Sequence, residues 1–144
     1  MKFINRQKEL EKLEEYYQLS QKQLITVAIS GLRRVGKTTL VKEFIKNKKA
    51  LYLFVYDSKT STELLREFTE ELRHHKIITE LEAMSSWKVF FDILFQRCKN
   101  YILVFDEFQN FYTIDKSVFS ILQKNCDEYK STPLNIVILG SLIG

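Results

Sequence analysis

The chain contains the segment Gly31-Leu32-Arg33-Arg34-Val35-Gly36-Lys37-Thr38. This segment fits G-x-x-x-x-G-K-[ST], the pattern of a phosphate-binding loop (P-loop). It follows the apolar, β-branched run Leu24–Ile29 and precedes a helix predicted over about Lys37–Lys48, so it joins a strand to a helix as that loop requires. The two glycines let the backbone adopt positive φ angles and approach phosphates without an intervening Cβ. We therefore expect a phosphate-binding loop at this junction.

Each residue type in this segment can bind one part of a nucleoside triphosphate. The amides from Gly36 to Thr39 are expected to point into the loop at a helix N-terminus, where the helix dipole favours an anion. Lys37 is expected to bridge β- and γ-phosphate oxygens, and the Thr38 hydroxyl to ligate Mg²⁺. The predicted phosphate-binding residues are Gly31, Leu32, Arg33, Arg34, Val35, Gly36, Lys37, Thr38 and Thr39. The side chains of Arg33 and Arg34 are either solvated or contact a partner.

Outward from this loop, apolar strands alternate with amphipathic helices along the whole chain. Because the strand segments are continuously apolar, we expect them to be buried on both faces of a parallel sheet covered by helices, which is a three-layer α/β fold. Two N-caps are expected, Asn5 for the first helix and Asp115 for the last, and Thr60 with Glu63 forms a capping box. The predicted strands are 24–29, 50–55, 101–105 and 134–139, and the predicted helices are 6–19, 37–48, one from Thr60, 86–99 and 116–129.

A second motif follows the third predicted strand. There Asp106-Glu107 comes directly after Tyr101–Phe105, an acid after an apolar strand, which matches the Walker B pattern. Ligands of open parallel sheets bind outside the carboxyl ends of the strands, where both motifs fall. We expect Asp106 to hold Mg²⁺ through water and Glu107 to polarise the attacking water as a general base. Ser141, after the fourth strand, either hydrogen-bonds the γ-phosphate or the attacking water, or is only a polar residue at a strand end.

The absence of guanine-recognition motifs narrows the choice of nucleotide. A guanine-specific GTPase needs an N-K-x-D element, and Asn47-Lys48-Lys49-Ala50 lacks the aspartate. We therefore expect an adenine nucleotide, ATP or ADP. The net charge is +4, with +7 in residues 1–60 and −3 in residues 61–144, so an anion would favour the N-terminal part. This charge is too small to imply nucleic-acid binding.

Composition excludes several other classes of protein. With 144 residues and 45% hydrophobic side chains, the chain is long enough for one globular domain, and no apolar run approaches the ~18 residues of a membrane helix. Cys98 and Cys126 form neither a C-x-x-C pair nor a disulfide framework, which favours a reducing, cytoplasmic location. We interpret Trp87 as a core residue and His74-His75 as surface residues rather than as a base-stacking platform and metal ligands.

Taken together, these residues resemble the archaeal-type ATPase family, a branch of P-loop NTPases related to the AAA+ and STAND classes. The resemblance runs through Phe3–Leu10, Gly31–Leu40, Trp87, Val104–Gln109 and Ile138–Ser141. It implies ATP and Mg²⁺ binding, with Asn5 and Arg6 near the adenine. It also implies that Asp106 and Glu107 are the Walker B pair and that Ser141 occupies the sensor position.

The resemblance further implies how the domain is organised. Members of this family resemble one another in having the strand order 5-1-4-3-2. We therefore expect the order 1-4-3-2 here, with the fifth strand beyond Gly144. Residues 1–144 would form a single P-loop ATPase core that is truncated at its C-terminal end. Leu24–Ile29 would then be an unprotected edge through which copies of the chain self-associate.

Two functions fit these observations. One is an ATPase core with Glu107 as the base, and the other is a nucleotide-dependent switch that hydrolyses little. A small-molecule kinase is less well supported, since no arginine cluster follows Asp106. Whether the parent chain has a protein or a nucleic-acid partner stays open.

Overall fold

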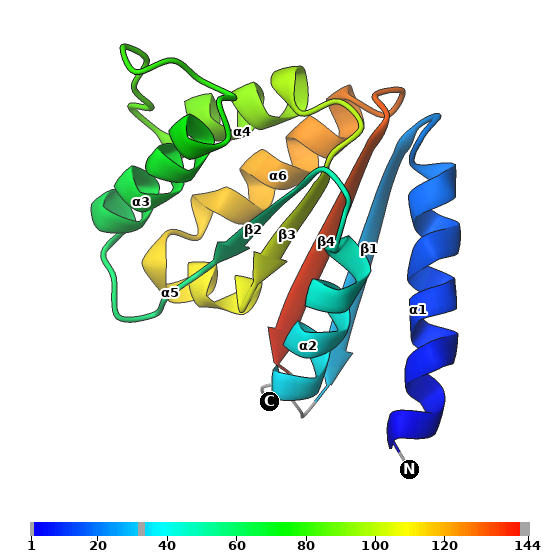
Figure 1. Ribbon diagram of the computed structural model, residues 1–144. Coiled ribbons are helices and arrows are strands. Elements are labelled where there is room, and N and C mark those ends of the chain that lie inside the picture. The colour runs from blue at the N-terminus through cyan, green and yellow to red at the C-terminus, as the bar shows by residue number, and fades with distance from the viewer. Residues whose placement is uncertain (1, 32–33, 142–144) are drawn as a thin grey trace.

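The computed structural model describes the backbone of residues 2–31 and 34–141, and the side chains of residues 7–30 and 36–140. Within these residues a four-stranded parallel sheet has the order β1-β4-β3-β2 (Figure 1). This confirms the predicted order 1-4-3-2. The strands are β1 (Leu24–Gly31), β2 (Ala50–Phe54), β3 (Ile102–Asp106) and β4 (Leu134–Ser141).

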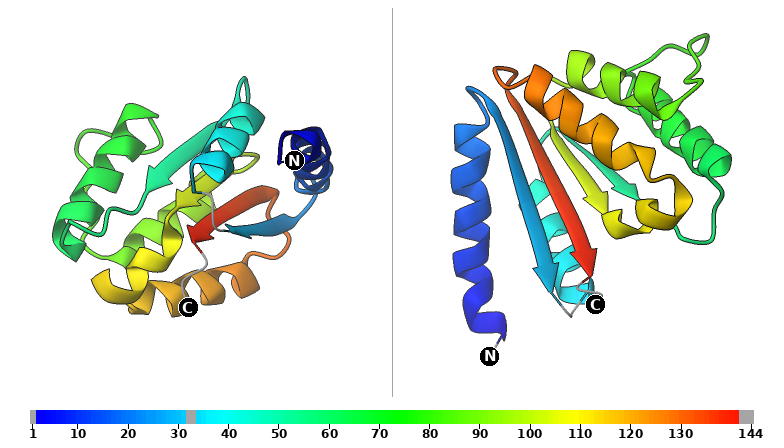
Figure 2. Two further views of the ribbon diagram at one scale, coloured as in Figure 1. Left: turned by 90° about the horizontal axis from the view of Figure 1, so that it is seen from below. Right: turned by 180° about the vertical axis from the view of Figure 1, so that it is seen from behind.

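Helices cover both faces of the sheet (Figure 2), which confirms the three-layer α/β fold. On one face lie α1 (Lys2–Leu19) and α2 (Arg34–Ile45). On the other lie α3 (Ser61–His74), α4 (Trp87–Arg97) and α6 (Ser117–Glu128). Two short helices, η1 (Phe108–Asn110) and α5 (Phe111–Ile114), follow β3 directly and were not predicted.

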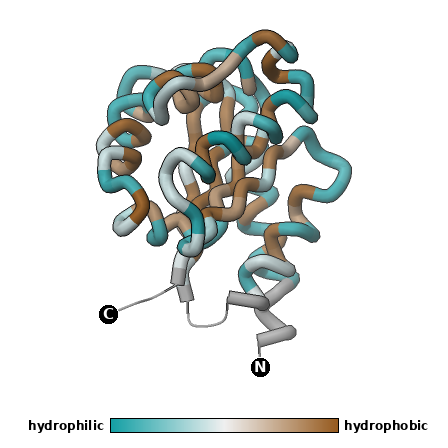
Figure 3. Tube along the Cα trace, turned by 90° about the vertical axis from the view of Figure 1, so that its left-hand side faces the viewer, coloured by the Kyte–Doolittle hydropathy of each residue, from teal (hydrophilic) through white to brown (hydrophobic). Residues whose placement is uncertain are grey.

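Each face of the sheet has its own hydrophobic core, and apolar strands run between more polar outer helices (Figure 3). The smaller core joins Leu13 of α1 and Val41 and Phe44 of α2 to β3 and β4. The larger one is rich in aromatic residues from α3 and α4, and Trp87, 4% exposed, lies within it. Its burial confirms the interpretation of Trp87 as a core residue.

The first strand differs from the prediction. One face of β1 is covered more completely than the other, because Val27 and Ile29 pack against the α1–α2 core while Thr26, Ala28 and Ser30 on the opposite face are exposed. The strand lies at the sheet edge, and its second face is covered only near its start, where Leu24 packs against the larger core and Thr26 Oγ1 lies 4.0 Å from Cys126 Sγ of α6. An unbroken apolar run therefore predicted the strand correctly and its burial wrongly.

Three helix starts also differ from the prediction, and α2 begins at Arg34 instead of about Lys37. Asn5 is not an N-cap, since α1 begins at Lys2 and the backbone of Asn5 is already helical. Lys116 occupies the N-cap position of α6, but the Asp115 carboxylate still accepts the Ser117 N–H at 3.1 Å. The capping box of Thr60 and Glu63 at α3 is confirmed.

Both cysteines are free thiols. Cys98 is fully buried, and this burial raises the pKa of its thiol to about 12, so it stays protonated and packs as a small apolar side chain. Among the described helices, none combines the length and apolar character needed to span a bilayer.

Candidate functional site

The described parts of the two predicted motifs lie at the carboxyl edge of the sheet. There the last residue pair of β1 and β4 is Gly31 and Ser141, and α2 begins at Arg34. The strand β3 ends at Asp106 at the same edge, because all four strands are parallel. The topology therefore brings together the two motifs that are about 70 residues apart in the sequence.

The side chain of Lys37 turns back over the end of β4. It is 8% exposed, and its Nζ donates a hydrogen bond to the carbonyl oxygen of Gly140 at 2.6 Å. The ammonium thus lies beside the loop at the start of α2, where a phosphate would meet both its charge and the positive end of the helix dipole.

A hydrogen bond joins the P-loop to the Walker B strand. The Thr38 hydroxyl donates to Oδ2 of Asp106 at 2.8 Å, and Asp106 is completely buried. The hydroxyl of Tyr52, on β2, donates to the same oxygen. Burial, with a contribution from the Asp106 carboxylate, raises the pKa of Tyr52 far above its usual value, so this hydroxyl remains a donor.

The donor set around Asp106 fits a magnesium ion. Its second oxygen, Oδ1, is buried and has no hydrogen-bond partner among the described residues, a state that costs free energy unless a cation or water completes it. Carboxylate and hydroxyl oxygens are hard ligands of the kind that Mg²⁺ prefers, and this ion commonly takes one or two protein ligands together with phosphates and water. No larger cluster of metal-ligating side chains occurs in the described part of the chain.

Glu107 begins the turn after β3. It is 5% exposed and has a left-handed backbone conformation, with φ 55° and ψ 42°, which costs roughly 1–2 kcal/mol for a residue with a Cβ. Nε2 of Gln109 donates to Glu107 Oε1 at 2.6 Å. A Cβ added to Gly140 would lie 3.0 Å from Oε1 of Gln109, so the glycine allows this amide to approach β4 closely.

Some predicted site residues are only partly described. Leu32 and Arg33 lie outside the described residues. For five further residues the structure describes the backbone but not the side chain: Asn5, Arg6, Arg34, Val35 and Ser141. The backbones of these residues lie in α1, at the start of α2 and at the end of β4, and Gly36 and Thr39 are exposed in the first turns of α2. Their roles stay predictions.

Sequence reasoning missed Tyr52 and the contact made by Gln109. A signal for Tyr52 was available, because it carries the only side-chain polar group in the run Ala50–Val55, and a buried tyrosine hydroxyl usually finds a partner. Gln109 gave no such signal, since its position depends on the unpredicted helix η1.

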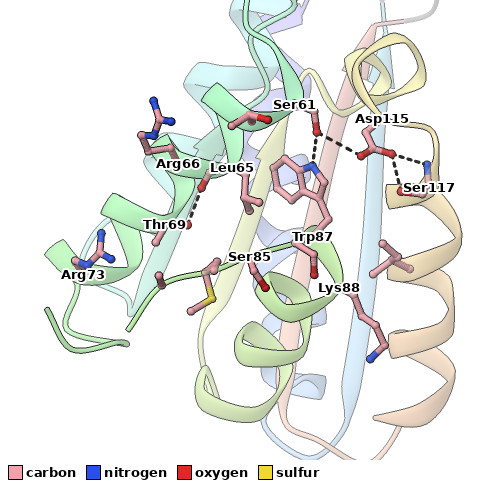
Figure 4. A pocket seen from close by; sticks show the side chains of 15 residues that line it. Ser61, Leu65, Arg66, Thr69, Arg73, Ser85, Trp87, Lys88, Asp115 and Ser117 are labelled. Carbon is pink, nitrogen blue, oxygen red and sulfur yellow. Dashed lines mark hydrogen bonds between the residues drawn. The ribbon is translucent and has the colours of Figure 1, made fainter. Parts of the chain in front are cut away.

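A cavity of about 610 Å³ lies on the face of the sheet opposite α2, between α3, the segment 83–88 and α6 (Figure 4). In it, Trp87 Nε1 donates to Ser61 Oγ at 2.8 Å, and Ser61 Oγ donates to Asp115 at 3.3 Å. Two of its cations, Arg73 and Lys88, are paired with acids of their own helices. None of the described residues of the P-loop or of β3 lines this cavity, so it is separate from the described part of the candidate site.

The chain is similar in sequence to several known proteins. The model of a family described as an ATPase domain predominantly from Archaea matches residues 3–144. An uncharacterised protein of Methanocaldococcus jannaschii is 29% identical over 143 residues, which is 98% of this chain and 30% of that protein. An uncharacterised ATP-binding protein of the same organism is 49% identical over 47 residues, 33% of this chain and 76% of that protein.

Two solved structures have a similar fold. A Walker-type ATPase of Pyrococcus abyssi has a TM-score of 0.59 and 22% identity, covering 94% of this chain and 44% of that one. The ORC2 protein of Aeropyrum pernix, in ADPNP–ADP complexes, has a TM-score of 0.63 and 16% identity, covering 94% and 41%. The chain thus spans less than half the length of these two proteins and of the relative it matches over most of its length.

Proposed function

Because the chain belongs to the family of ATPase domains found predominantly in Archaea, we propose that it binds ATP together with Mg²⁺ at the carboxyl edge of its sheet and hydrolyses it. The observation that carries this proposal is the hydrogen bond from Thr38 to Asp106, because it joins the phosphate-binding loop to the acidic strand end. Lys37 supplies the cation beside it.

In this proposal the loop Gly31–Thr39 binds the phosphates with its amides and Lys37, and Asn5 and Arg6 lie near the adenine. Thr38 and Asp106 would hold Mg²⁺, which neutralises phosphate charge when bound. The buried Oδ1 of Asp106 supports this assignment.

Glu107 is the proposed general base. It follows Asp106 at the strand end and is nearly buried, and Gln109 orients one of its oxygens. Ser141, paired with Gly31 across the last rung of the sheet, is proposed to contact the γ-phosphate or the attacking water. Together these residues would orient and activate water next to the bound phosphates.

The proposal is tested by calorimetric titration of ATP with and without Mg²⁺, with GTP as the comparison, and by steady-state release of phosphate. Tight binding of ATP that is strengthened by Mg²⁺, with release of phosphate, supports it. Failure to bind ATP, or equal binding of GTP, contradicts the assigned nucleotide.

A nucleotide-dependent switch is the second candidate, favoured by the contact between Lys37 and Gly140. A phosphate that binds the Lys37 ammonium would break its hydrogen bond to the end of β4. Binding of the nucleotide would therefore change the contacts at the sheet edge. Binding of ATP without release of phosphate would favour this candidate.

We expect residues 1–144 alone to turn over slowly, with kcat below about 1 s⁻¹. An arginine contributed by a lid or by a neighbouring molecule adds about 10³–10⁵ in rate to related reactions, and no arginine follows Arg97 in this sequence. Steady-state phosphate release at saturating Mg²⁺-ATP measures this, and a kcat above about 1 s⁻¹ would contradict the expectation.

We also propose that this chain self-associates through β1. This strand pairs only with β4 among the described strands, and clefts of about 360 and 330 Å³ that both include Ala28 and Ile29 flank it. A free edge offers unpaired N–H and C=O groups to another strand.

We expect light scattering to detect dimers or larger species that form as concentration increases. Ala28→Lys places a charge at the exposed edge and should reduce their formation, whereas Ser120→Lys, on the exposed surface of α6, should not. A wild-type chain that stays monomeric at high concentration would contradict the proposal.

A further inference from the structure

We propose that Tyr52 is a positioning residue for the divalent cation, which it serves by holding the Asp106 carboxylate in one orientation. This inference rests on the proposed function, because it assigns Tyr52 to the same nucleotide site. It goes beyond the motifs, since Tyr52 belongs to neither the P-loop nor the acidic strand end.

The register of the sheet gives Tyr52 access to Asp106. In the pairing of β2 with β3, Phe54 lies opposite Asp106 and Tyr52 opposite Val104. Residues two apart in a strand share a face, so Tyr52 and Asp106 lie on the same side of the sheet, one pair apart. The long tyrosine side chain spans that distance, and its hydroxyl donates to Asp106.

The two donors act on one oxygen only. Both the Tyr52 and Thr38 hydroxyls donate to Oδ2 of Asp106, while Oδ1 is buried without a partner among the described groups. Because the donors come from different elements, β2 and α2, they restrict rotation of the carboxylate. This keeps Oδ1 available to the hydrated cation. Loss of Tyr52 would leave Thr38 as the only described donor to this carboxylate.

The ring of Tyr52 is itself held in place. Lys42 of α2 lies over it, with Nζ 4.9 Å from the ring centroid, and the ring packs against the core between α2 and the sheet. A tyrosine that only filled space here would need no hydroxyl, so phenylalanine would replace it without consequence for the cation. The two roles therefore predict different results for Tyr52→Phe.

The test measures cation affinity directly. Protein saturated with ADP is titrated with Mn²⁺, and free Mn²⁺ is followed by electron paramagnetic resonance. Removing an outer partner of a metal ligand commonly costs about 10–100-fold in affinity, so we expect Tyr52→Phe to weaken Mn²⁺ binding about 10-fold. ADP affinity in EDTA should stay within about twofold. The matched control is Tyr101→Phe, which removes a hydroxyl just before β3, at the opposite end of that strand.

The outcomes separate the inference from the function on which it rests. If wild-type protein binds ADP and Mn²⁺ and Tyr52→Phe binds Mn²⁺ equally well, the inference alone is wrong. If wild-type protein binds no ADP, both the proposed function and the inference about Tyr52 are wrong. In an Asp106→Asn background, Tyr52→Phe should cause no further loss of Mn²⁺ affinity, because its effect passes through that carboxylate. If Tyr52→Phe lowers Mn²⁺ affinity as much in the Asp106→Asn background as in the wild-type protein, the positioning role of Tyr52 is wrong, even if Tyr52→Phe is less stable.

Discussion

Replacing Lys37 with alanine should weaken ATP binding by a factor of roughly 30 to 5,000, which corresponds to about 2–5 kcal/mol for the loss of one partner from a desolvated charge pair. Lys37 is nearly buried, and its ammonium already lies next to the loop, bound to the Gly140 carbonyl. Its charge would therefore act on the phosphates with little screening by water.

Isothermal titration of ATP into the variant measures this loss. Lys46→Ala is the matched control, because it removes the same charge from an exposed position just after α2 and should leave ATP affinity unchanged. Thermal unfolding without nucleotide should show that both variants remain folded. ATP affinity like that of the wild type in Lys37→Ala would contradict the assignment of the P-loop.

The fold was predictable because its strongest signals are local and consistent with one another. Four apolar runs separated by amphipathic helices favour a parallel sheet covered by helices. The strand order came from the family resemblance, because β1 and β2 are consecutive in the chain but lie at opposite edges of the sheet. The capping box at Thr60 was predicted from a local signal, since it depends on residues within one helical turn.

The remaining differences come from tertiary context. Whether Thr26 and Ala28 are buried depends on which helices cover β1, and no local pattern contains that information. The conformation of Glu107, with φ 55°, follows from the sharp turn between β3 and η1, which a run of apolar and polar letters does not encode. The contact of Tyr52 with Asp106 depends on the register between β2 and β3, and a pattern search along one strand cannot find it.

Glu107→Gln should retain ATP binding and lose hydrolysis by roughly 10²–10⁴-fold, the usual contribution of a positioned general base. The substitution preserves shape, and a glutamine carbonyl can still accept the hydrogen bond from Gln109 that Glu107 Oε1 accepts at 2.6 Å. What it removes is the carboxylate that would take a proton from water. Glu128→Gln, on the exposed end of α6, is the matched control.

The backbone of Glu107 makes this prediction more specific. A left-handed conformation at a non-glycine residue costs roughly 1–2 kcal/mol, and such strain is typical of functional sites, where the surrounding structure maintains it. Because Gln incurs the same backbone cost as Glu, Glu107→Gln should leave the unfolding temperature nearly unchanged, so a loss of phosphate release would report chemistry and not folding. Single-turnover phosphate release from the variant at the wild-type rate, with ATP bound equally tightly, would show that Glu107 is not the base and would leave its strained turn without a catalytic explanation.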